Sequence, residues 1–232
     1  MAMNPAILSP TLSTLFPPGA VAAELRDPGD PGLLLPAEGN GLGRAVPQRL
    51  QEFAAGRLCA RRALAEFGIV DFAIEAAEDR RPIWPDGMVG SITHTAGFCA
   101  AVVAERRSSA GLGIDTEVIG EVNGQIWSRI CVSREIDWLH SLPASQQTGA
   151  VALIFSAKEA FYKCWYPLLR ERLDFQDVTV TPEWNAADGS FRIHVGRSVA
   201  VRHVAALPLA GRYVFHEGFV SAGVSWAADP PQ

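Results

Sequence analysis

The chain has 232 residues, of which 48% are hydrophobic and 19% charged, a composition typical of a packed globular protein and not of a disordered, collagenous or coiled-coil chain. Lys and Arg number 20 against 25 Asp and Glu, so the net charge of −5 gives no overall attraction to nucleic acid or to an anionic membrane surface. An anionic ligand would therefore need a local cationic site.

Proline and glycine are frequent over residues 1–46, which predicts extended structure wrapped around a core, with a short strand at 20–25. Pro47 opens the first helical pattern, in which apolar residues recur at three- and four-residue spacing until Gly68 ends it. Three strand patterns follow, at 70–77, 88–93 and 97–104.

The polar residues 105–111 connect this half of the chain to a second half in which the order repeats. A strand pattern at 111–118 leads to three helical patterns, at about 122–130, 134–141 and 145–170. Five strand patterns complete the chain, at 176–181, 190–195, 199–204, 212–217 and 219–226. We therefore predict an α+β fold of two similar, pseudo-duplicated lobes, each a long helix packed on an antiparallel sheet, with domains at 1–108 and 109–232.

The cysteines lie more than thirty residues apart, without the close pairs that zinc sites and redox motifs need, so we expect buried thiols. The N-terminal region has no Lys or Arg before Arg26 and is interrupted by prolines, so it lacks the form of a signal peptide. The longest apolar stretches are also too short to cross a bilayer. These features predict a reduced, cytoplasmic protein with no membrane span.

The two lysines of the chain stand out against eighteen arginines, because both lie in one run, FSAKEAFYK at 155–163. Where arginine serves elsewhere as the positive charge, a retained lysine indicates a place that needs a compact ammonium and not a planar guanidinium. We therefore expect chemistry at Lys158 and Lys163.

A pair of carboxylates occurs in the segment GLGIDTEV at 111–118. Side chains of a strand alternate between its two faces, so Asp115 and Glu117 lie on the same face. Such a pair repels itself unless solvent or a cation compensates, and hard oxygen ligands of this kind suit Mg²⁺. The alternative is a solvated strand face.

The lysine-bearing helix adds a third carboxylate. Glu159 and Lys163 are four residues apart and share one helix face with Phe155 and Tyr162, and Lys158 lies at its margin. This set could form only an exposed ion pair, but the aromatic neighbours make unpaired charge costly without a ligand or metal. Three carboxylates with two lysines are what a metal-assisted reaction on a phosphate ester would use.

Cationic residues of the first half form a candidate phosphate pocket. The strand 88–93 leads to His94, and Arg57 and Arg61 are neighbours on the preceding helix. Arg80 and Arg81 lie in the turn-rich segment before the strand. A lone histidine is more often structural, but together with arginines it could bind a phosphate.

Four segments occur together in the chain: AGRLCAR at 55–61, RPIWPDGMVGSITHT at 81–95, GIDTE at 113–117 and FSAKEAFYK at 155–163. In this order and spacing they resemble the 4′-phosphopantetheinyl transferase family, in its larger, two-lobed, monomeric class. The resemblance implies transfer of phosphopantetheine from coenzyme A to a serine of an apo acyl or peptidyl carrier protein, with release of adenosine 3′,5′-bisphosphate. The resemblance implies carriers that belong to fatty-acid, polyketide, nonribosomal-peptide or siderophore synthesis. It also implies that coenzyme A lies in the cleft between the lobes.

The resemblance also implies roles for the second-half residues. Asp115, Glu117 and Glu159 would bind Mg²⁺, or Mn²⁺ in its place, and Glu159 would be the general base for the carrier serine. Lys158 and Lys163 would contact the pyrophosphate, and Lys163 would stabilise the leaving group.

In the first half, the resemblance implies that His94, Arg57 and Arg61 meet the 3′-phosphate of coenzyme A. Segment 80–93 would line the adenine pocket, which makes Arg80, Arg81 and Ser91 cofactor-binding candidates. The chain departs from the family in having arginines where some members have lysines in the first helix, and Phe155 where many have Trp.

Two other functional classes remain open at this point. A metal-dependent phosphohydrolase could use the same acids with water as the nucleophile, and would consume coenzyme A without a carrier. A non-catalytic coenzyme A-binding module would not need Glu159.

Overall fold

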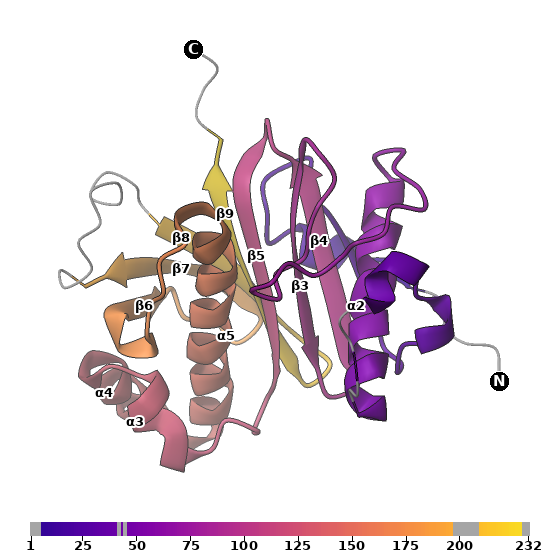
Figure 1. The fold of residues 1–232 in the computed structure, drawn as a ribbon. Helices are drawn as coiled ribbons and strands as arrows, with labels where there is room; N and C mark the ends of the chain where they lie inside the picture. Colours follow the sequence, from indigo (N-terminus) through magenta and orange to yellow (C-terminus); the bar gives the residue numbers. More distant parts are fainter. Residues whose placement is uncertain (1–5, 41–42, 44–45, 197–208, 229–232) are drawn as a thin grey trace.

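The computed structural model describes residues 6–40, 43, 46–196 and 209–228. It contains two antiparallel sheets, of strand order β1-β2-β4-β3 and β5-β9-β8-β7-β6. Figure 1 shows the two sheets side by side, with the long helix α2 packed on the first and the long helix α5 on the second. The predicted α+β fold of two lobes is confirmed.

The first lobe is built around α2 and its four-stranded sheet. Pro47 occupies the first turn of α2, where its missing N–H removes no helical hydrogen bond. Alanines and Cys59 on the buried face let the helix lie close to β2 and β4. The elements of this lobe are β1 (Ile7–Leu8), α1 (Pro10–Ser13), β2 (Val21–Leu25), η1 (Pro31–Leu33), η2 (Pro36–Gly39), α2 (Pro47–Ala65), β3 (Met88–Thr95) and β4 (Phe98–Glu105).

The prediction of a strand at 70–77 is wrong, since this segment has only one isolated bridge, between Ala76 and Pro82. The backbone N–H and carbonyl groups of Ile74 form their hydrogen bonds with side chains of other segments. Arg57 Nε donates to the carbonyl oxygen of Ile74 at 2.7 Å, and the Ile74 N–H donates to Glu38 Oε1 at 3.1 Å. The N-terminal region also differs from expectation, because short helices interrupt its extended structure.

The second lobe is built around α5, whose predicted range of 145–170 agrees with the structure to within a residue. The strand expected at 199–204 lies outside the described residues. The elements of this lobe are β5 (Ser109–Val118), η3 (Gly124–Ile126), α3 (Trp127–Ile130), α4 (Ser133–Ser141), α5 (Ala144–Leu169), η4 (Phe175–Asp177), β6 (Val178–Pro182), β7 (Asp188–Val195), β8 (Leu209–His216) and β9 (Phe219–Ala227).

The expected thiols are confirmed, since all four cysteines are buried and unpaired. The described part of the chain contains no helix of the length and apolarity needed to cross a membrane.

The two lobes meet along β3 and β5, which are joined by side chains and not by a main-chain ladder. Ser91 Oγ accepts from the Ile114 N–H at 3.1 Å, and Thr93 Oγ1 accepts from the Thr116 N–H at 3.0 Å. A buried apolar cluster that includes Leu112 of β5 and residues of β3, β4 and α1 fills the space behind this seam. The seam places the end of β3 next to the acidic end of β5.

The close packing of α5 on β5 depends on Gly113. A Cβ at this position would overlap the carbonyl oxygen of Ala160 and lie 2.8 Å from the backbone nitrogen of Cys164. We therefore expect Gly113→Ala to lower the free energy of unfolding by about 1–3 kcal/mol, as measured by urea denaturation. Gly124→Ala is the matched control, because a Cβ at Gly124 meets no atom within 4 Å. Equal stability of the two variants would contradict the prediction.

Candidate active site

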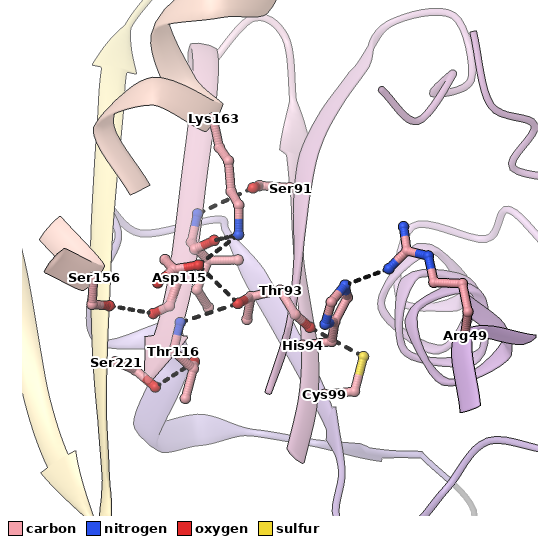
Figure 2. A network of polar contacts seen from close by, with 11 residues as sticks. Arg49, Ser91, Thr93, His94, Cys99, Asp115, Thr116, Ser156, Lys163 and Ser221 are labelled. Carbon is pink, nitrogen blue, oxygen red and sulfur yellow. Dashed lines mark hydrogen bonds and ion pairs between the residues drawn. The ribbon is translucent and has the colours of Figure 1, made fainter. Parts of the chain in front are cut away.

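The acidic end of β5 faces the middle of α5 and the end of β3. Asp115 is 5% exposed, and its Oδ1 accepts from Lys163 Nζ at 2.6 Å and from Thr93 Oγ1 at 3.2 Å (Figure 2). Lys163 Nζ also donates to the carbonyl oxygen of Ile114 at 3.3 Å. Asp115 Oδ2 is buried and has no hydrogen-bond partner among the described residues. A buried acceptor left in this way is costly unless a ligand satisfies it.

The three predicted carboxylates influence one another. Burial raises the pKa of Glu117 to about 8, and the negative charges of Asp115 and Glu159 add to this effect while Lys163 opposes it. Burial also raises the pKa of Glu159, again with a contribution from Asp115 and against Lys163. Strand and helix periodicity predict two separate faces, Asp115 with Glu117 and Glu159 with Lys163, and the structure brings these two faces together.

The donor chemistry of this site fits a divalent cation. Three carboxylates supply hard oxygen ligands of the kind that Mg²⁺ prefers, and no described residue donates to the buried Asp115 Oδ2. Among the described residues, however, no three His, Cys, Asp or Glu side chains are already gathered closely enough to hold a metal ion.

A cationic group from the first lobe lies on α2 and at the end of β3. Arg49 Nη1 donates to His94 Nε2 at 2.9 Å (Figure 2). Arg49, Phe53 and Arg57 are four residues apart on one face of α2, and the Arg57 guanidinium lies 4.0 Å from the centre of the Phe53 ring. Burial lowers the pKa of Arg57 to about 10. Its Nη2 is buried without a hydrogen-bond partner among the described residues, which leaves both N–H donors of this nitrogen for an anion.

His94 connects the two groups of charges. Its pKa is lowered, chiefly by burial, with Arg49 and Lys163 contributing and Glu52 and Asp115 opposing. A first-lobe histidine is thus within electrostatic reach of the second-lobe lysine and aspartate. His94 is therefore the residue of the cationic group whose charge is influenced by Lys163 and Asp115 of the second lobe.

A cavity of about 690 Å³ lies between the lobes, within the size range of small-molecule cofactor sites. Segment 78–84, β3, the start of β5 and the end of α5 form its walls. Lys163 lines it and also bonds Asp115, so the carboxylates lie next to the cavity. The predicted cofactor-binding residues in its wall are Arg80, Arg81, Ser91 and Lys163, and it is also lined by Trp84, Arg106, Tyr162, Tyr166 and Arg172.

Two predicted site residues have other partners. Arg61 is paired with the buried carboxylate of Glu38 and donates to the Leu33 carbonyl oxygen. Lys158 does not present its ammonium beside Glu159 and Lys163, which corrects the expectation from helical spacing. Its side chain turns toward α3 and α4, where it is buried against Glu135.

Sequence reasoning missed Arg49 and Thr93. The spacing of Arg49, Phe53 and Arg57 could have identified Arg49, because residues four apart share a helix face. Thr93 carries no such signal, since its bonds to Asp115 and to the Thr116 N–H exist only where β3 lies along β5.

Comparisons with known proteins agree with this architecture. Residues 38–104 match the family model of the 4′-phosphopantetheinyl transferase N-terminal domain, and residues 111–214 match that of the 4′-phosphopantetheinyl transferase superfamily. The chain is 37% identical over 222 residues to 4′-phosphopantetheinyl transferase Svp of Streptomyces mobaraensis, covering 94% of this chain and 89% of that protein.

Two further relatives have similar coverage. Npt of Nocardia iowensis, a 4′-phosphopantetheinyl transferase, is 32% identical over 223 residues, covering 93% of this chain and 100% of that protein. PptT of Mycobacterium tuberculosis, also a 4′-phosphopantetheinyl transferase, is 37% identical over 185 residues, covering 79% of this chain and 80% of that protein. With the two-lobed fold and the polar site between its lobes, these matches show that the chain belongs to the 4′-phosphopantetheinyl transferase superfamily.

Proposed function

We propose that this enzyme transfers 4′-phosphopantetheine from coenzyme A to a serine of apo acyl and peptidyl carrier proteins, with release of adenosine 3′,5′-bisphosphate. One observation carries the proposal: the Lys163 side chain lines the cavity between the lobes and at the same time donates to Asp115. A phosphate ester in the cavity would therefore meet an ammonium and the carboxylate group at the same point.

Coenzyme A matches the charges and surfaces of the site. Its diphosphate would lie at Lys163. Its adenine would lie against the part of the wall formed by segment 80–93, which includes Trp84. Its 3′-phosphate would be bound by Arg49, Arg57 and His94, where the unpartnered Arg57 Nη2 offers a donor. Arginine is suited to this role because its planar fork binds phosphate oxygens in pairs.

The chemistry then follows from the positions of Glu159 and Lys163. Asp115, Glu117 and Glu159 would hold Mg²⁺, or Mn²⁺ in its place, which when bound would neutralise charge on the diphosphate. Glu159 accepts the proton of the carrier serine hydroxyl as the general base. The serine oxygen bonds to the phosphorus of the phosphopantetheine, and the bond from that phosphorus to the bridging oxygen breaks. Lys163 donates to the oxygen on which negative charge develops.

The direct test is to incubate the protein with coenzyme A, Mg²⁺ and a panel of apo carrier proteins, and to measure the mass of each intact carrier. We expect one phosphopantetheine to be added to the carrier serine, with an equal amount of adenosine 3′,5′-bisphosphate formed. Loss of coenzyme A without any carrier would instead support a phosphohydrolase, and binding without turnover would support a non-catalytic module.

A second experiment tests the 3′-phosphate site. Charged hydrogen bonds contribute roughly 1.5–3 kcal/mol, so Arg49→Ala, Arg57→Ala and His94→Ala should each weaken coenzyme A binding about tenfold or more. Binding of dephospho-coenzyme A, measured by calorimetry, should change little. Arg62→Ala is the control, because Arg62 lies on the same helix but pairs with Glu66. An equal loss for both ligands would assign the three residues to another role.

We further propose that the enzyme is a cytoplasmic monomer with the domain division 1–108 and 109–232. Both walls of the cavity come from one chain. The four free thiols suit a reducing compartment. The proposed division falls in the turn between β4 and β5, at the junction of the two sheets.

A further inference from the structure

The ammonium of Lys158 is fully engaged by protein groups. Its Nζ donates to the Ile130 carbonyl oxygen at 2.8 Å, to Glu135 Oε2 at 2.7 Å and to the Phe175 carbonyl oxygen at 2.8 Å. An ammonium has three N–H donors, so these bonds leave none for a phosphate. The side chains of Lys158 and Glu135 are each only 1% exposed. This buried lysine, together with Glu135, therefore forms a connection between elements of the second lobe, and it is not exposed to a ligand.

Glu135 extends the connection to two more segments. Its Oε2 also accepts from the Val132 N–H at 2.8 Å, at the start of α4, and its Oε1 accepts from the Val180 N–H of β6 at 2.7 Å. The single pair of side chains thus links α5 to the end of α3, the start of α4, η4 and β6. Backbone groups at these positions depend on it for their hydrogen bonds.

The connection lies directly beside the proposed general base. Glu159 follows Lys158 in the chain, and the segment 173–178 faces it across a second cavity of about 170 Å³. The bond from Lys158 to the Phe175 carbonyl oxygen ties that segment to the helix turn that carries Glu159. Losing the bond would free one wall of this second cavity, which Glu159 also lines.

We propose that Lys158 is a positioning residue, which with Glu135 holds α3, α4 and the segment 173–178 in register with Glu159, and that it makes no contact with the coenzyme A phosphates. The proposal rests on the proposed transferase function for its effect on rate. It assigns different roles to the two lysines: Lys163 acts on the ligand, and Lys158 acts through the protein.

The test compares Lys158→Met, Glu135→Gln and the double variant with Lys163→Met, using full-length protein. Lys158→Met leaves the Glu135 carboxylate buried without its cation, which is strongly unfavourable. We expect faster amide hydrogen exchange over 127–135 and 175–180, and a kcat for transfer lowered about tenfold or more, since small displacements near reacting groups are costly. The dissociation constant of coenzyme A, measured by calorimetry, should stay within about twofold of the unmodified protein, whereas Lys163→Met should weaken binding.

The double variant keeps the test decisive if Lys158→Met is poorly folded. Glu135→Gln removes the uncompensated charge and keeps an acceptor for the Val180 N–H, so the double variant should recover amide protection and part of the transfer rate. Coenzyme A binding weakened as much as in Lys163→Met, or a double variant no better than Lys158→Met, would overturn the proposal. Normal exchange with lost transfer would also overturn it. Absence of transfer by the unmodified protein would count against the proposed function instead, because exchange and calorimetry do not require turnover.

Discussion

Replacing Lys163 with arginine is expected to lower kcat by roughly 10²-fold, the size of effect seen when one transition-state donor is lost, while coenzyme A affinity changes little. The Lys163 ammonium lies 2.6 Å from Asp115 Oδ1 and 3.3 Å from the Ile114 carbonyl oxygen. The same side chain lines the cavity between the lobes. A guanidinium keeps the charge but is wider and planar, so it cannot place a donor at the same point.

Single-turnover kinetics with saturating coenzyme A and apo carrier would measure this loss, and calorimetry would measure affinity. Arg62→Lys is the matched control, because it exchanges one positive charge for another at an arginine of α2 that pairs with Glu66 and does not line the cavity. We expect that variant to retain nearly full activity. An unimpaired Lys163→Arg enzyme would mean that the position requires only positive charge.

Asp115→Asn is expected to lower kcat by about 10²–10³-fold, since loss of several kcal/mol of charge stabilisation in phosphoryl transfer corresponds to this factor. The amide keeps the size of the side chain and can still accept from Thr93, so the seam between β3 and β5 should persist. It removes the negative charge that pairs with Lys163 and that would hold a divalent cation.

The transfer assay that measures kcat for Asp115→Asn also tests whether the reaction needs a divalent metal ion. Transfer by the unmodified enzyme should stop in excess chelator and return on addition of Mg²⁺ or Mn²⁺. Glu121→Gln is the control for Asp115→Asn. Glu121 is an exposed acid within electrostatic reach of Glu117, but it lies outside the group formed by the three carboxylates. Circular dichroism would confirm that each variant is folded. Full transfer activity in excess chelator would contradict the proposed metal site.

Much of the second-lobe site could be predicted from sequence because its members are close in the chain. Strand alternation is enough to put Asp115 and Glu117 on one face, and a four-residue helical spacing is enough to put Glu159 and Lys163 on another. The structure brings these two faces together. The same periodicities predict the long helices and the two-lobed α+β fold.

Tertiary contacts overrode local pattern at two places. Segment 70–77 has strand-like composition, but Arg57 and Glu38 satisfy the backbone of Ile74, so it does not pair as a strand. Lys158 lies at the margin of the expected face, but Glu135, 23 residues away, draws its ammonium toward α3 and α4 and away from Lys163. No local spacing signals either contact.

Sequence alone therefore determined the fold class, the carboxylate pairing on β5 and the Glu159–Lys163 face of α5, because a fixed helical or strand period decides which neighbours share a face. Only the tertiary structure decided that Arg49 joins His94, that Thr93 bonds Asp115 and which residues line the cavity between the lobes. Those contacts depend on how β3 lies along β5, and that register is set by the packing of side chains distant in the chain.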